Sequence, residues 1–463
     1  MRIALIHIAR GMDGTPASPI IDHLGLQCLE GALSKKHNVQ IFDTALLRID
    51  DISLLQKIVA FSPDIAGFTL NYINCKDVEI FAASLKKIYP SVRIIAGGLY
   101  ATFHQEYLLH SDSSFDAVVL CEGETPLLNM ASTEQWDEIP GVAVRCGSEI
   151  VSRPPLRPND FFDLPNRSFS QLPALAKFPR GCAKAALEAS RGCTHACSFC
   201  SIAASQKMAR DSCRRRLRPT EDIAKEISYI HDTFGMYDFW FMDADFLGPT
   251  AEQERIRRLS QQIRDMGIRN LTLEIDARVD GVSSASIAKL AEAGLQKCFL
   301  GVESFDARTL NRFAKGTTPA MNLQAIKILE QEGVRPIIGV IMFHPQSTKD
   351  QLLRDHEALR GIGYEKTQML FRLKKYRGSR EAQSTDSDGR GIAPWADYGW
   401  EFDDPEIAEI WNRFDSLRLA ALDKVFVGLT DELKLKTISV ETFIRKADEI
   451  FHAFGEDVEN IFC

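Results

Sequence analysis

The sequence predicts an α/β protein with two consecutive parallel sheets and a mainly helical C-terminal region. Short apolar runs alternate with helical patterns through residues 1–150, and the same alternation returns over residues 186–375. A proline-rich stretch, residues 151–185, separates the two, and residues 376–463 become polar and then helical. Alternating strands and helices are typical of parallel sheets covered by helices, so we expect one α/β domain on each side of a linker.

The first domain is expected to be a doubly wound, Rossmann-like sheet. Apolar runs predict strands at Arg2–Ile8, Val39–Phe42, Ile65–Leu70, Val92–Gly97 and Asp116–Cys121. Apolar residues recur at helical spacing over Leu24–Ser34 and Val78–Ile88. Sheets of this kind bind ligands beyond the carboxyl ends of their strands, which predicts a ligand site at that edge.

Three strand-end loops carry residues suited to such a site. They contribute Thr69 and Asn71, then Gly97, Gly98 and Leu99, and finally Glu122 and Gly123. Paired glycines let the backbone approach a ligand closely because no Cβ intervenes. Any one loop could be a plain tight turn, but all three fall on one edge of one sheet.

Residues 151–185 are expected to run over the surface as a linker, because they hold six prolines. The second domain then shows strand patterns at Ala186–Ser190, Asp238–Asp243, Leu271–Ile275, Lys297–Val302, Arg335–Phe343 and Thr367–Leu373. Helices between them have clear boundary signals, such as Thr318-Pro319 at one start and Gly333 at its end. Six strand–helix units predict a partial β/α barrel with its site at the carboxyl-terminal mouth.

The C-terminal region is expected to form helices at about Glu406–Phe426 and Asp431–Phe454. We interpret them as a cap over the barrel mouth that contributes to substrate choice.

Composition narrows the function classes. A net charge of −8 gives no reason to expect a nucleic-acid backbone as substrate. No apolar run approaches the length of a membrane span, and the N-terminus resembles a strand more than a signal peptide. Eleven cysteines without an export signal favour a reducing cytoplasm and metal binding over disulfides.

Several cysteines and one basic run leave alternatives open. Cys28, Cys75, Cys121 and Cys298 lie in apolar contexts and are expected in the core. Each of Cys182, Cys213 and Cys463 could approach the functional site, although a single cysteine is more often inert. The run Arg214-Arg215-Arg216-Leu217-Arg218 is interpreted as a solvated loop, with recognition of an acidic substrate or a reductase as the alternative.

The most specific motif is the triplet Cys193, Cys197 and Cys200, spaced C-x3-C-x2-C directly after the first barrel strand. Three thiolates at this spacing can bind three irons of a [4Fe–4S] cluster and leave the fourth iron open to another ligand. Zinc is the competing interpretation, with His195 as a conceivable fourth ligand. His195 lies between two cysteines, where a short loop gives its ring little freedom to converge on a zinc ion.

This triplet resembles the signature of radical S-adenosylmethionine (radical SAM) enzymes, including the aromatic Phe199 before the third cysteine. Further motifs resemble those members that carry an N-terminal cobalamin-binding domain. They are Ser190-Arg191-Gly192-Cys193, Phe241-x-Asp243-x-x-Phe246, Gly301-Val302-Glu303-Ser304, Lys315-Gly316-Thr317, Ala96-Gly97-Gly98 and Glu122-Gly123-Glu124. The resemblance covers roughly residues 1–375.

The resemblance implies a [4Fe–4S] cluster, S-adenosylmethionine and cobalamin. It places Phe199, Asp243, Arg278, Glu303 and Ser304 around S-adenosylmethionine. It places Thr69, Asn71, Gly97, Gly98, Leu99, Glu122 and Gly123 around cobalamin. Any lone strand-end carboxylate among them is equally consistent with a helix cap or a salt bridge.

Two departures from the family pattern matter. The fifth barrel strand ends in Phe343-His344-Pro345 instead of a Gly-x-Pro-Gly turn, so His344 is either an acid–base or substrate group or a plain turn residue. The chain also lacks D-x-H-x-x-G, the motif that supplies a histidine to cobalt in other cobalamin enzymes. Members of this subgroup commonly lack it.

The leading function implied is methylation of an unactivated carbon of a small biosynthetic intermediate. The alternatives are a rearrangement, cyclisation, oxidation or heteroatom insertion without methyl transfer, and a non-catalytic cobalamin or iron–sulfur sensor. An electron donor such as flavodoxin or ferredoxin is implied as partner, because the cluster must be reduced.

Overall fold

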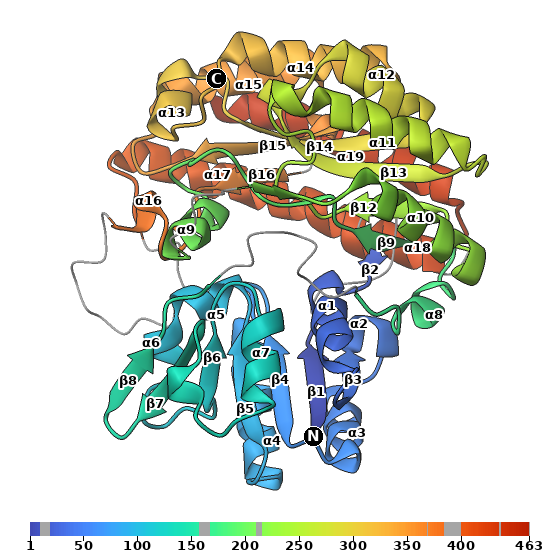
Figure 1. Cartoon of the computed structure of the whole chain (residues 1–463). Helices are drawn as coiled ribbons and strands as arrows, with labels where there is room; N and C mark the ends of the chain where they lie inside the picture. Colours follow the sequence, from blue (N-terminus) through green and yellow to red (C-terminus); the bar gives the residue numbers. More distant parts are fainter. Residues whose placement is uncertain are drawn as a thin grey trace.

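The computed structural model describes residues 1–9, 19–156, 167–209, 215–367, 369–383, 400–434 and 437–462. Within these residues, two seven-stranded sheets form the two α/β domains, and one two-stranded sheet joins β10 (Ser190–Gly192) to β11 (Arg215–Leu217). Figure 1 shows the first domain (blue to teal) below the second, with the C-terminal helices (red) along the second sheet. None of the described helices is long and apolar enough to cross a membrane.

The first sheet has the strand order β3-β1-β4-β5-β6-β7-β8. Its strands are β1 (Arg2–His7), β3 (Asn38–Asp43), β4 (Ile65–Thr69), β5 (Arg93–Gly97), β6 (Ala117–Val119), β7 (Val142–Cys146) and β8 (Glu149–Ser152). The first five pair in parallel, which confirms the predicted doubly wound sheet. The antiparallel hairpin of β7 and β8 was not predicted.

Helices cover both faces of this sheet and form two separate cores. Helices α1 (Leu24–Leu33) and α7 (Glu124–Met130) pack on one face, and α3 (Asp51–Phe61) and α4 (Cys75–Ile88) pack on the other. Short helices α2 (Thr44–Leu47) and α5 (Leu99–Phe103) follow strand ends, and α6 (Gln105–Leu108) follows α5.

The second sheet has the order β16-β15-β14-β13-β12-β9-β2 and is parallel throughout. Its strands are β9 (Ala183–Leu187), β12 (Asp238–Phe241), β13 (Thr272–Arg278), β14 (Leu295–Glu303), β15 (Arg335–Phe343), β16 (Met369–Arg372) and β2 (Ile20–Ile21). The six predicted barrel strands are thus present in order. The first begins three residues earlier than expected, and β2 from the first domain adds an unpredicted edge.

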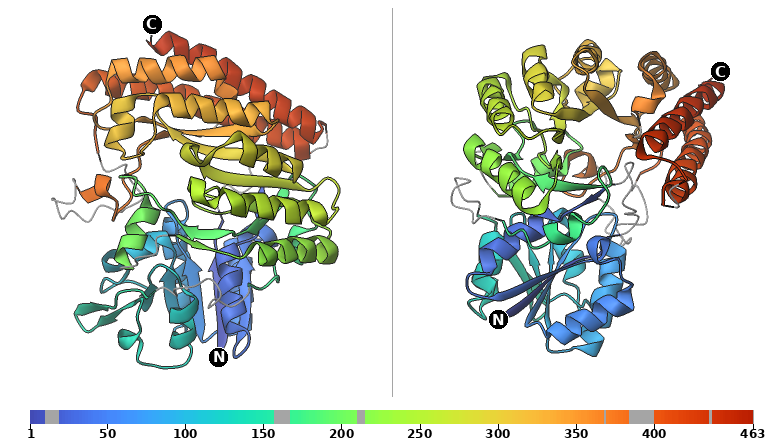
Figure 2. Two further views of the ribbon diagram at one scale, coloured as in Figure 1. Left: turned by 45° about the horizontal axis from the view of Figure 1, so that its top comes forward. Right: turned by 90° about the vertical axis from the view of Figure 1, so that its right-hand side faces the viewer.

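Helices pack on the outer face of this sheet (Figure 1). They are α10 (Thr220–Phe234), α11 (Gln253–Asp265), α12 (Ser284–Glu292), α13 (Ala307–Arg312), α14 (Pro319–Gln331) and α15 (Lys349–Ile362). Gly235 ends α10 at φ +66°, a left-handed conformation that glycine adopts without strain. The sheet and these helices form an open arc, the predicted partial barrel (Figure 2).

The described part of residues 151–185 is more than a surface linker. Helix α8 (Leu172–Leu175) buries both of its end residues against α2, α10 and β9. Arg167 is also buried and pairs with Asp22 and Glu226. This stretch therefore fixes the first domain to the barrel, because its apolar and charged side chains have partners on both.

The C-terminal region is helical, as predicted. It contains α16 (Arg380–Gln383), α17 (Pro405–Asp423), the π-helical segment Lys424–Leu429, α18 (Thr430–Lys434) and α19 (Val440–Phe462). Helix α17 packs Trp411 and Phe414 on Phe343 of β15. Helices α17 and α19 lie along the open side of the arc (Figure 2), whereas α16, from the same region, contacts the cysteine loop at the barrel mouth.

Candidate functional site

The cysteine triplet lies in the loop between β10 and α9 (Ser201–Met208), at the carboxyl-terminal mouth of the barrel. Cys193, Cys197 and Cys200 are all half-buried and in no disulfide. The loop is fixed from the barrel side, because the Ser198 amide donates to the carbonyl of Phe313 at 2.9 Å. The three sulfur atoms are therefore held on one short, anchored loop.

Arg278, at the end of β13, places a positive charge in contact with the triplet. Its Nη1 donates to Cys197 Sγ at 3.3 Å. The guanidinium is held by Asp280 at 2.9 Å and by the carbonyl of Lys315 at 2.5 Å. Burial raises the pKa of the Cys193 and Cys200 thiols. Iron binds the deprotonated thiolate, so a fixed cation beside these sulfurs offsets the negative charge that deprotonation creates.

His195 does not turn toward the sulfur atoms. Its Nε2 lies 3.0 Å from Asp280, and its Nδ1 lies 3.1 Å from the Thr194 hydroxyl. Across the described ranges, no three His, Cys, Asp or Glu side chains converge as one metal ion requires. A four-iron cluster spreads its ligands more widely than a single zinc ion does, so the three thiols fit the cluster better.

The other residues expected around S-adenosylmethionine divide into two groups. Glu303 ends β14 at φ +69° and accepts from Lys315 Nζ at 2.9 Å, beside Arg278. Phe199 packs edge-on against Phe313, with ring centroids 5.3 Å apart. Arg278 thus contacts the triplet loop, Phe199 anchors the loop to Phe313, and Glu303 lies next to Arg278 through Lys315.

Asp243 and Ser304 serve the protein itself. Asp243 is buried and accepts from the Ala189 amide at 2.9 Å and from the Ser190 hydroxyl, just before the triplet loop. Ser304 is fully buried, and its hydroxyl donates to Asp355 at 2.9 Å and accepts from the Asp306 amide. Neither side chain presents a free group to the mouth.

His344 is a buried turn residue next to the same region. Its amide donates to the Ser347 hydroxyl at 2.9 Å, and its ring lies edge-on to Phe313. Burial lowers the pKa of the imidazole to about 4, so the ring is neutral at physiological pH. Its Nδ1 is buried without a hydrogen-bond partner. The structure does not bring His344 into contact with any triplet cysteine.

The second expected site is a cavity of about 590 Å³ at the carboxyl edge of the first sheet. Of the seven residues predicted there, six line it: Thr69, Asn71, Gly97, Gly98, Glu122 and Gly123. Leu99 is not among the lining residues. Gly98 has φ +95°, and a Cβ there would lie 2.6 Å from the Leu70 carbonyl, so only glycine fits this turn. Apolar side chains of the sheet and of α1 form the floor of the cavity, which suits a cofactor with a large ring.

Charged residues cross between this cavity and the cysteine loop. Arg191, two residues before Cys193, also lines the cavity and pairs with Glu124 at 2.8 Å, Glu188 at 2.9 Å and Glu122 at 3.4 Å. Arg216 forms a second ion pair with Glu122. One ion-pair network therefore connects the wall of this cavity to the start of the cysteine loop.

The basic run was wrongly interpreted as a solvated loop. Arg215 and Arg216 are buried, and Arg215 pairs with Glu252 at 3.1 Å. Arg218 pairs with Glu226. The arginines of this run pair with acidic residues from both domains. These partners are distant in the chain, so the linear sequence does not show the contacts.

Sequence reasoning also missed a histidine pair in the cavity wall. His7 Nδ1 lies 3.1 Å from Asp43, and the His7 and His23 rings lie 4.7 Å apart. Burial lowers the pKa of His23 to about 4. His7 is the last residue of β1. This position at a strand end is the feature of the sequence that could have identified it as a cavity residue.

The remaining cysteines are now placed. Cys28, Cys75 and Cys298 are buried as expected, whereas Cys121 is half-buried and lines the cavity. Cys182 precedes β9 and so lies at the opposite end of that strand from the triplet. Cys213 and Cys463 lie outside the described residues.

A segment after β16 covers the triplet loop from outside. Glu381 accepts from the Ser198 hydroxyl at 2.8 Å and pairs with Arg312 at 2.8 Å. Arg380 donates to the carbonyl of Ala196 at 3.1 Å. The Arg377 amide donates to the Tyr72 hydroxyl at 3.2 Å. Residues 374–383 therefore join the cysteine loop to the first domain, a contact that sequence reasoning did not predict.

Fold and site together define a two-domain iron–sulfur enzyme, with a thiolate loop at the mouth of a partial barrel and a second cofactor cavity facing it. The radical SAM superfamily model matches residues 187–359, and the B12 binding domain model matches residues 15–131. The chain is a radical SAM enzyme with an N-terminal B12-binding domain. The first domain implies cobalamin, and the second implies a [4Fe–4S] cluster and S-adenosylmethionine.

Individual relatives agree with this assignment. An uncharacterized methyltransferase, PH0819 of Pyrococcus horikoshii, is 26% identical over 345 residues, which cover 73% of this chain and 72% of the relative. The anaerobic magnesium-protoporphyrin IX monomethyl ester cyclase of Synechocystis is 26% identical over 326 residues, which cover 67% of this chain and 62% of the relative.

A solved structure supports the fold. The cobalamin-dependent S-adenosylmethionine radical enzyme OxsB, with aqua-cobalamin and S-adenosylmethionine bound, superposes with a TM-score of 0.75 at 16% identity. The match covers 99% of this chain and 80% of OxsB. At this identity, the likeness shows that the two chains share a fold.

Proposed function

We propose that this enzyme methylates an unactivated carbon of a small biosynthetic intermediate. The observation that carries the proposal is the shared wall: Arg191 lines the cavity of the B12-binding domain and lies two residues from Cys193. When bound, the cluster and S-adenosylmethionine supply a 5′-deoxyadenosyl radical, and cobalamin carries the methyl group. The name of the PH0819 relative agrees with methyl transfer.

The atoms and electrons of this reaction balance as follows. A substrate C–H bond breaks and a C–CH₃ bond forms. One S-adenosylmethionine becomes S-adenosylhomocysteine, and another becomes methionine and 5′-deoxyadenosine, which takes the substrate hydrogen. Two electrons are required, and we propose that flavodoxin or ferredoxin supplies them.

Residues of this chain would orient and shield the reactants. Arg278 and the Glu303–Lys315 pair surround the triplet loop and offer charge-assisted hydrogen bonds to the amino-acid and ribose groups of S-adenosylmethionine. Residues 374–383 cover the loop and exclude water from the site. The radical would be lost at a site that is exposed to water.

The competing outcome is a radical rearrangement or cyclisation without methyl transfer. The Synechocystis relative, a cyclase, is as similar to this chain as the methyltransferase relative. Both outcomes need the same cofactors, so only the fate of the methyl group separates them.

The test is turnover with methyl-labelled S-adenosylmethionine, a small-molecule extract as substrate source, and a reducing system. We expect the label in a new small molecule, together with S-adenosylhomocysteine and 5′-deoxyadenosine. Cys197→Ala is the control and should give none of these products, because it removes a cluster ligand. If all label stays in S-adenosylmethionine or methionine, the methyltransferase proposal fails. If no 5′-deoxyadenosine forms either, the result favours a non-catalytic sensor over an enzyme.

A further inference from the structure

Three segments that contact the cysteine loop are strongly basic. They are α9, which follows Cys200 directly, residues 307–315 with α13, and residues 374–383 with α16. Residues 201–209 of the first segment and the whole of the other two together contain eight lysines and arginines and one acidic residue, Glu381. The whole chain has a net charge of −8, so this basic character is local.

Contacts with the loop hold these segments together at one end of the barrel. The Ser198 amide donates to the Phe313 carbonyl at 2.9 Å, and the Ser198 hydroxyl donates to Glu381 at 2.8 Å. Phe199 of the loop packs against a small core that contains Phe313 and Leu373. Figure 1 shows α9, α13 and α16 at the same end of the second domain, on the left of the view. Their exposed side chains therefore belong to one region of the surface.

Half of the eight cations are exposed and without an acidic partner. The other four have acidic neighbours, as Arg312–Glu381, Arg377–Glu106, Lys315–Glu303 and Lys375–Asp403. The exposed four form no ion pair with any residue that the structure describes, and they are Lys207, Arg308, Lys374 and Arg380. We call these four residues the cationic rim.

The rim touches the cysteine loop at Arg380. The Arg380 guanidinium donates to the carbonyl of Ala196 at 3.1 Å, and Ala196 directly precedes Cys197. Thr194 and Ala196 are themselves exposed on this loop. A molecule that lies on the rim therefore reaches the loop whose thiols bind the cluster.

Charge decides which molecule this surface attracts. Exposed cations without partners attract a negatively charged surface, whereas the negative net charge of the whole chain repels it elsewhere. Such a distribution selects one orientation of the encounter, with the partner on the rim. Complexes that transfer electrons are small and short-lived, so complementary charge can guide them without a large apolar interface.

We propose that the cationic rim is the docking surface of an acidic one-electron carrier protein of the flavodoxin type. The reduced flavin of the carrier loses one electron and is oxidised, and the oxidised cluster gains that electron; no proton moves and no covalent bond changes. The inference rests on the proposed function for the need of electrons, and it adds the surface at which they enter.

Reduction of the reconstituted holoenzyme by flavodoxin hydroquinone, without substrate, tests this surface. Anaerobic stopped-flow absorbance follows the cluster. We expect the second-order rate constant to fall at least about tenfold when ionic strength rises from about 0.05 M to about 0.5 M, because salt screens exposed charges. Reduced methyl viologen, a small cationic reductant, serves as the comparison because it needs no docking surface.

Reversal of charge on the rim gives a second measurement. The rim variant carries Lys207→Glu, Arg308→Glu and Lys374→Glu, and it keeps Arg380 because that residue also holds the loop. We expect flavodoxin to reduce it at least about tenfold more slowly than the parent, since rim charges act mainly on the rate of association. Methyl viologen should reduce it at least as fast as the parent.

The matched control changes the net charge equally at a distant place. It carries Lys35→Glu, Lys57→Glu and Lys87→Glu, three exposed residues of the first domain. Lys57 lies on α3 and Lys87 lies on α4, which Figure 1 shows at the far end of that domain from α9, α13 and α16. Its rate with flavodoxin should stay within about twofold of the parent rate, because distant exposed charges are screened. Circular dichroism and iron content show whether each variant is folded and loaded.

Three results would overturn the proposal. They are equal flavodoxin rates for the rim variant and the control, a parent rate that does not depend on ionic strength, and no reduction by flavodoxin where methyl viologen reduces the cluster. Rim-dependent binding of RNA or anionic vesicles, with unchanged flavodoxin rates, would assign the surface to another partner and would overturn it as well.

These outcomes are separate from those of the proposed function. No substrate is present, so rim-dependent reduction stands even if labelled methyl groups are not transferred. Methyl transfer driven by methyl viologen would likewise stand if flavodoxin ignored the rim.

Discussion

Arg278 connects the third barrel strand to the cysteine loop through a single guanidinium. It contacts Cys197 Sγ, Asp280 and the Lys315 carbonyl at the same time. A cluster bound at Cys197 would therefore lie beside a fixed positive charge in a partly buried site. Net charge and hydrogen bonds to the sulfurs set the reduction potential of such clusters.

Replacing this arginine should make the cluster harder to reduce. In Arg278→Met, the reduced cluster loses a stabilising cation, so we expect its midpoint potential to fall by an amount on the order of tens of millivolts. A redox titration followed by electron paramagnetic resonance measures this shift. Arg257→Met, on the exposed pair with Glu254 of α11, is the matched control. An unchanged potential with full iron content would show that Arg278 only supports the loop.

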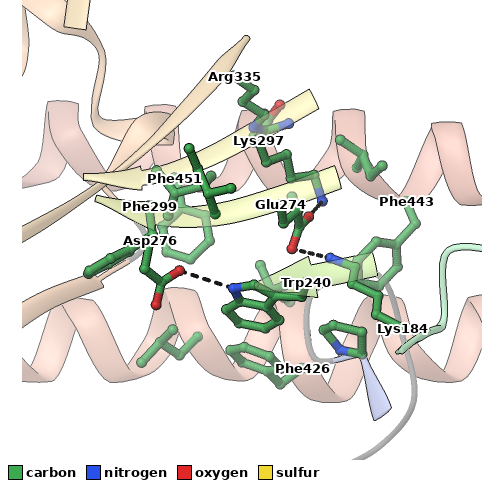
Figure 3. A pocket seen from close by; sticks show the side chains of 18 residues that line it. Lys184, Trp240, Glu274, Asp276, Lys297, Phe299, Arg335, Phe426, Phe443 and Phe451 are labelled. Atoms are coloured by element: carbon green, nitrogen blue, oxygen red, sulfur yellow. Dashed lines mark hydrogen bonds and ion pairs between the residues drawn. The ribbon is translucent and has the colours of Figure 1, made fainter. Parts of the chain in front are cut away.

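At the scale of one element, β13 shows how a single strand serves two sites. Its inward residues Glu274 and Asp276 line a cavity of about 260 Å³ between the barrel strands and the C-terminal helices (Figure 3), and Arg278 reaches the triplet. Its outward residue Leu273 is buried in the core shared with the outer helices. A period of two along the strand thus separates the chemistry from the packing.

This strand also predicts a pH dependence of stability. Burial raises the pKa of Asp276 from 3.8 to about 7, so the folded protein holds a proton there that the unfolded chain releases. The stability that this proton gives is complete below about pH 4 and is lost as pH rises through 7. Asp276→Asn removes this titration. The free energy of unfolding of the variant should therefore rise relative to that of the parent by about 2 kcal/mol between pH 5 and pH 8.

Thermal denaturation of both proteins across this pH range measures the difference. A constant difference between the melting temperatures would contradict the prediction, because it would mean that Asp276 is ionised in the folded protein throughout. Asp265→Asn, at the exposed end of α11, is the matched control variant.

At the scale of the whole molecule, ion pairs join the two domains. Arg191 and Arg216 of the second domain bind Glu122 and Glu124 of the first. Arg167 binds Asp22 and Glu226, one from each domain. These pairs are largely buried, so the orientation of the cavity toward the triplet depends on them.

Removing Arg191 should disturb the cofactor cavity and the interface together. Arg191→Met leaves Glu122, Glu124 and Glu188 without a shared cation, and breaking a buried pair in this way costs about 3–5 kcal/mol. We expect lower retention of cobalamin, measured by cobalt analysis, and a lower melting temperature. Adding Glu122→Gln and Glu124→Gln should recover part of the lost stability. Full cobalt content in Arg191→Met would show that the network does not shape the cavity.

Much of this architecture could be predicted from the linear pattern. The spacing of Cys193, Cys197 and Cys200 identifies the cluster loop because nearby residues must bind one compact group. The strands of both sheets follow from apolar runs bounded by turn residues, and Arg335–Phe343 was predicted to the residue. The glycine pair at 97 and 98 marks a strand-end cavity because only glycine fits at position 98. These are local properties, and local sequence determines them.

Contacts between distant residues needed the tertiary structure. The buried roles of Arg215 and Arg216 depend on Glu252 and Glu122, which are far away in the chain. Asp243 and Ser304, which are expected around S-adenosylmethionine, also hydrogen-bond to protein groups, because strand ends need partners for their own loops. The sequence by itself determined the cofactors and the two sheets. Only the folded chain decided which charges meet, because an ion pair depends on distance in space and not on spacing in sequence.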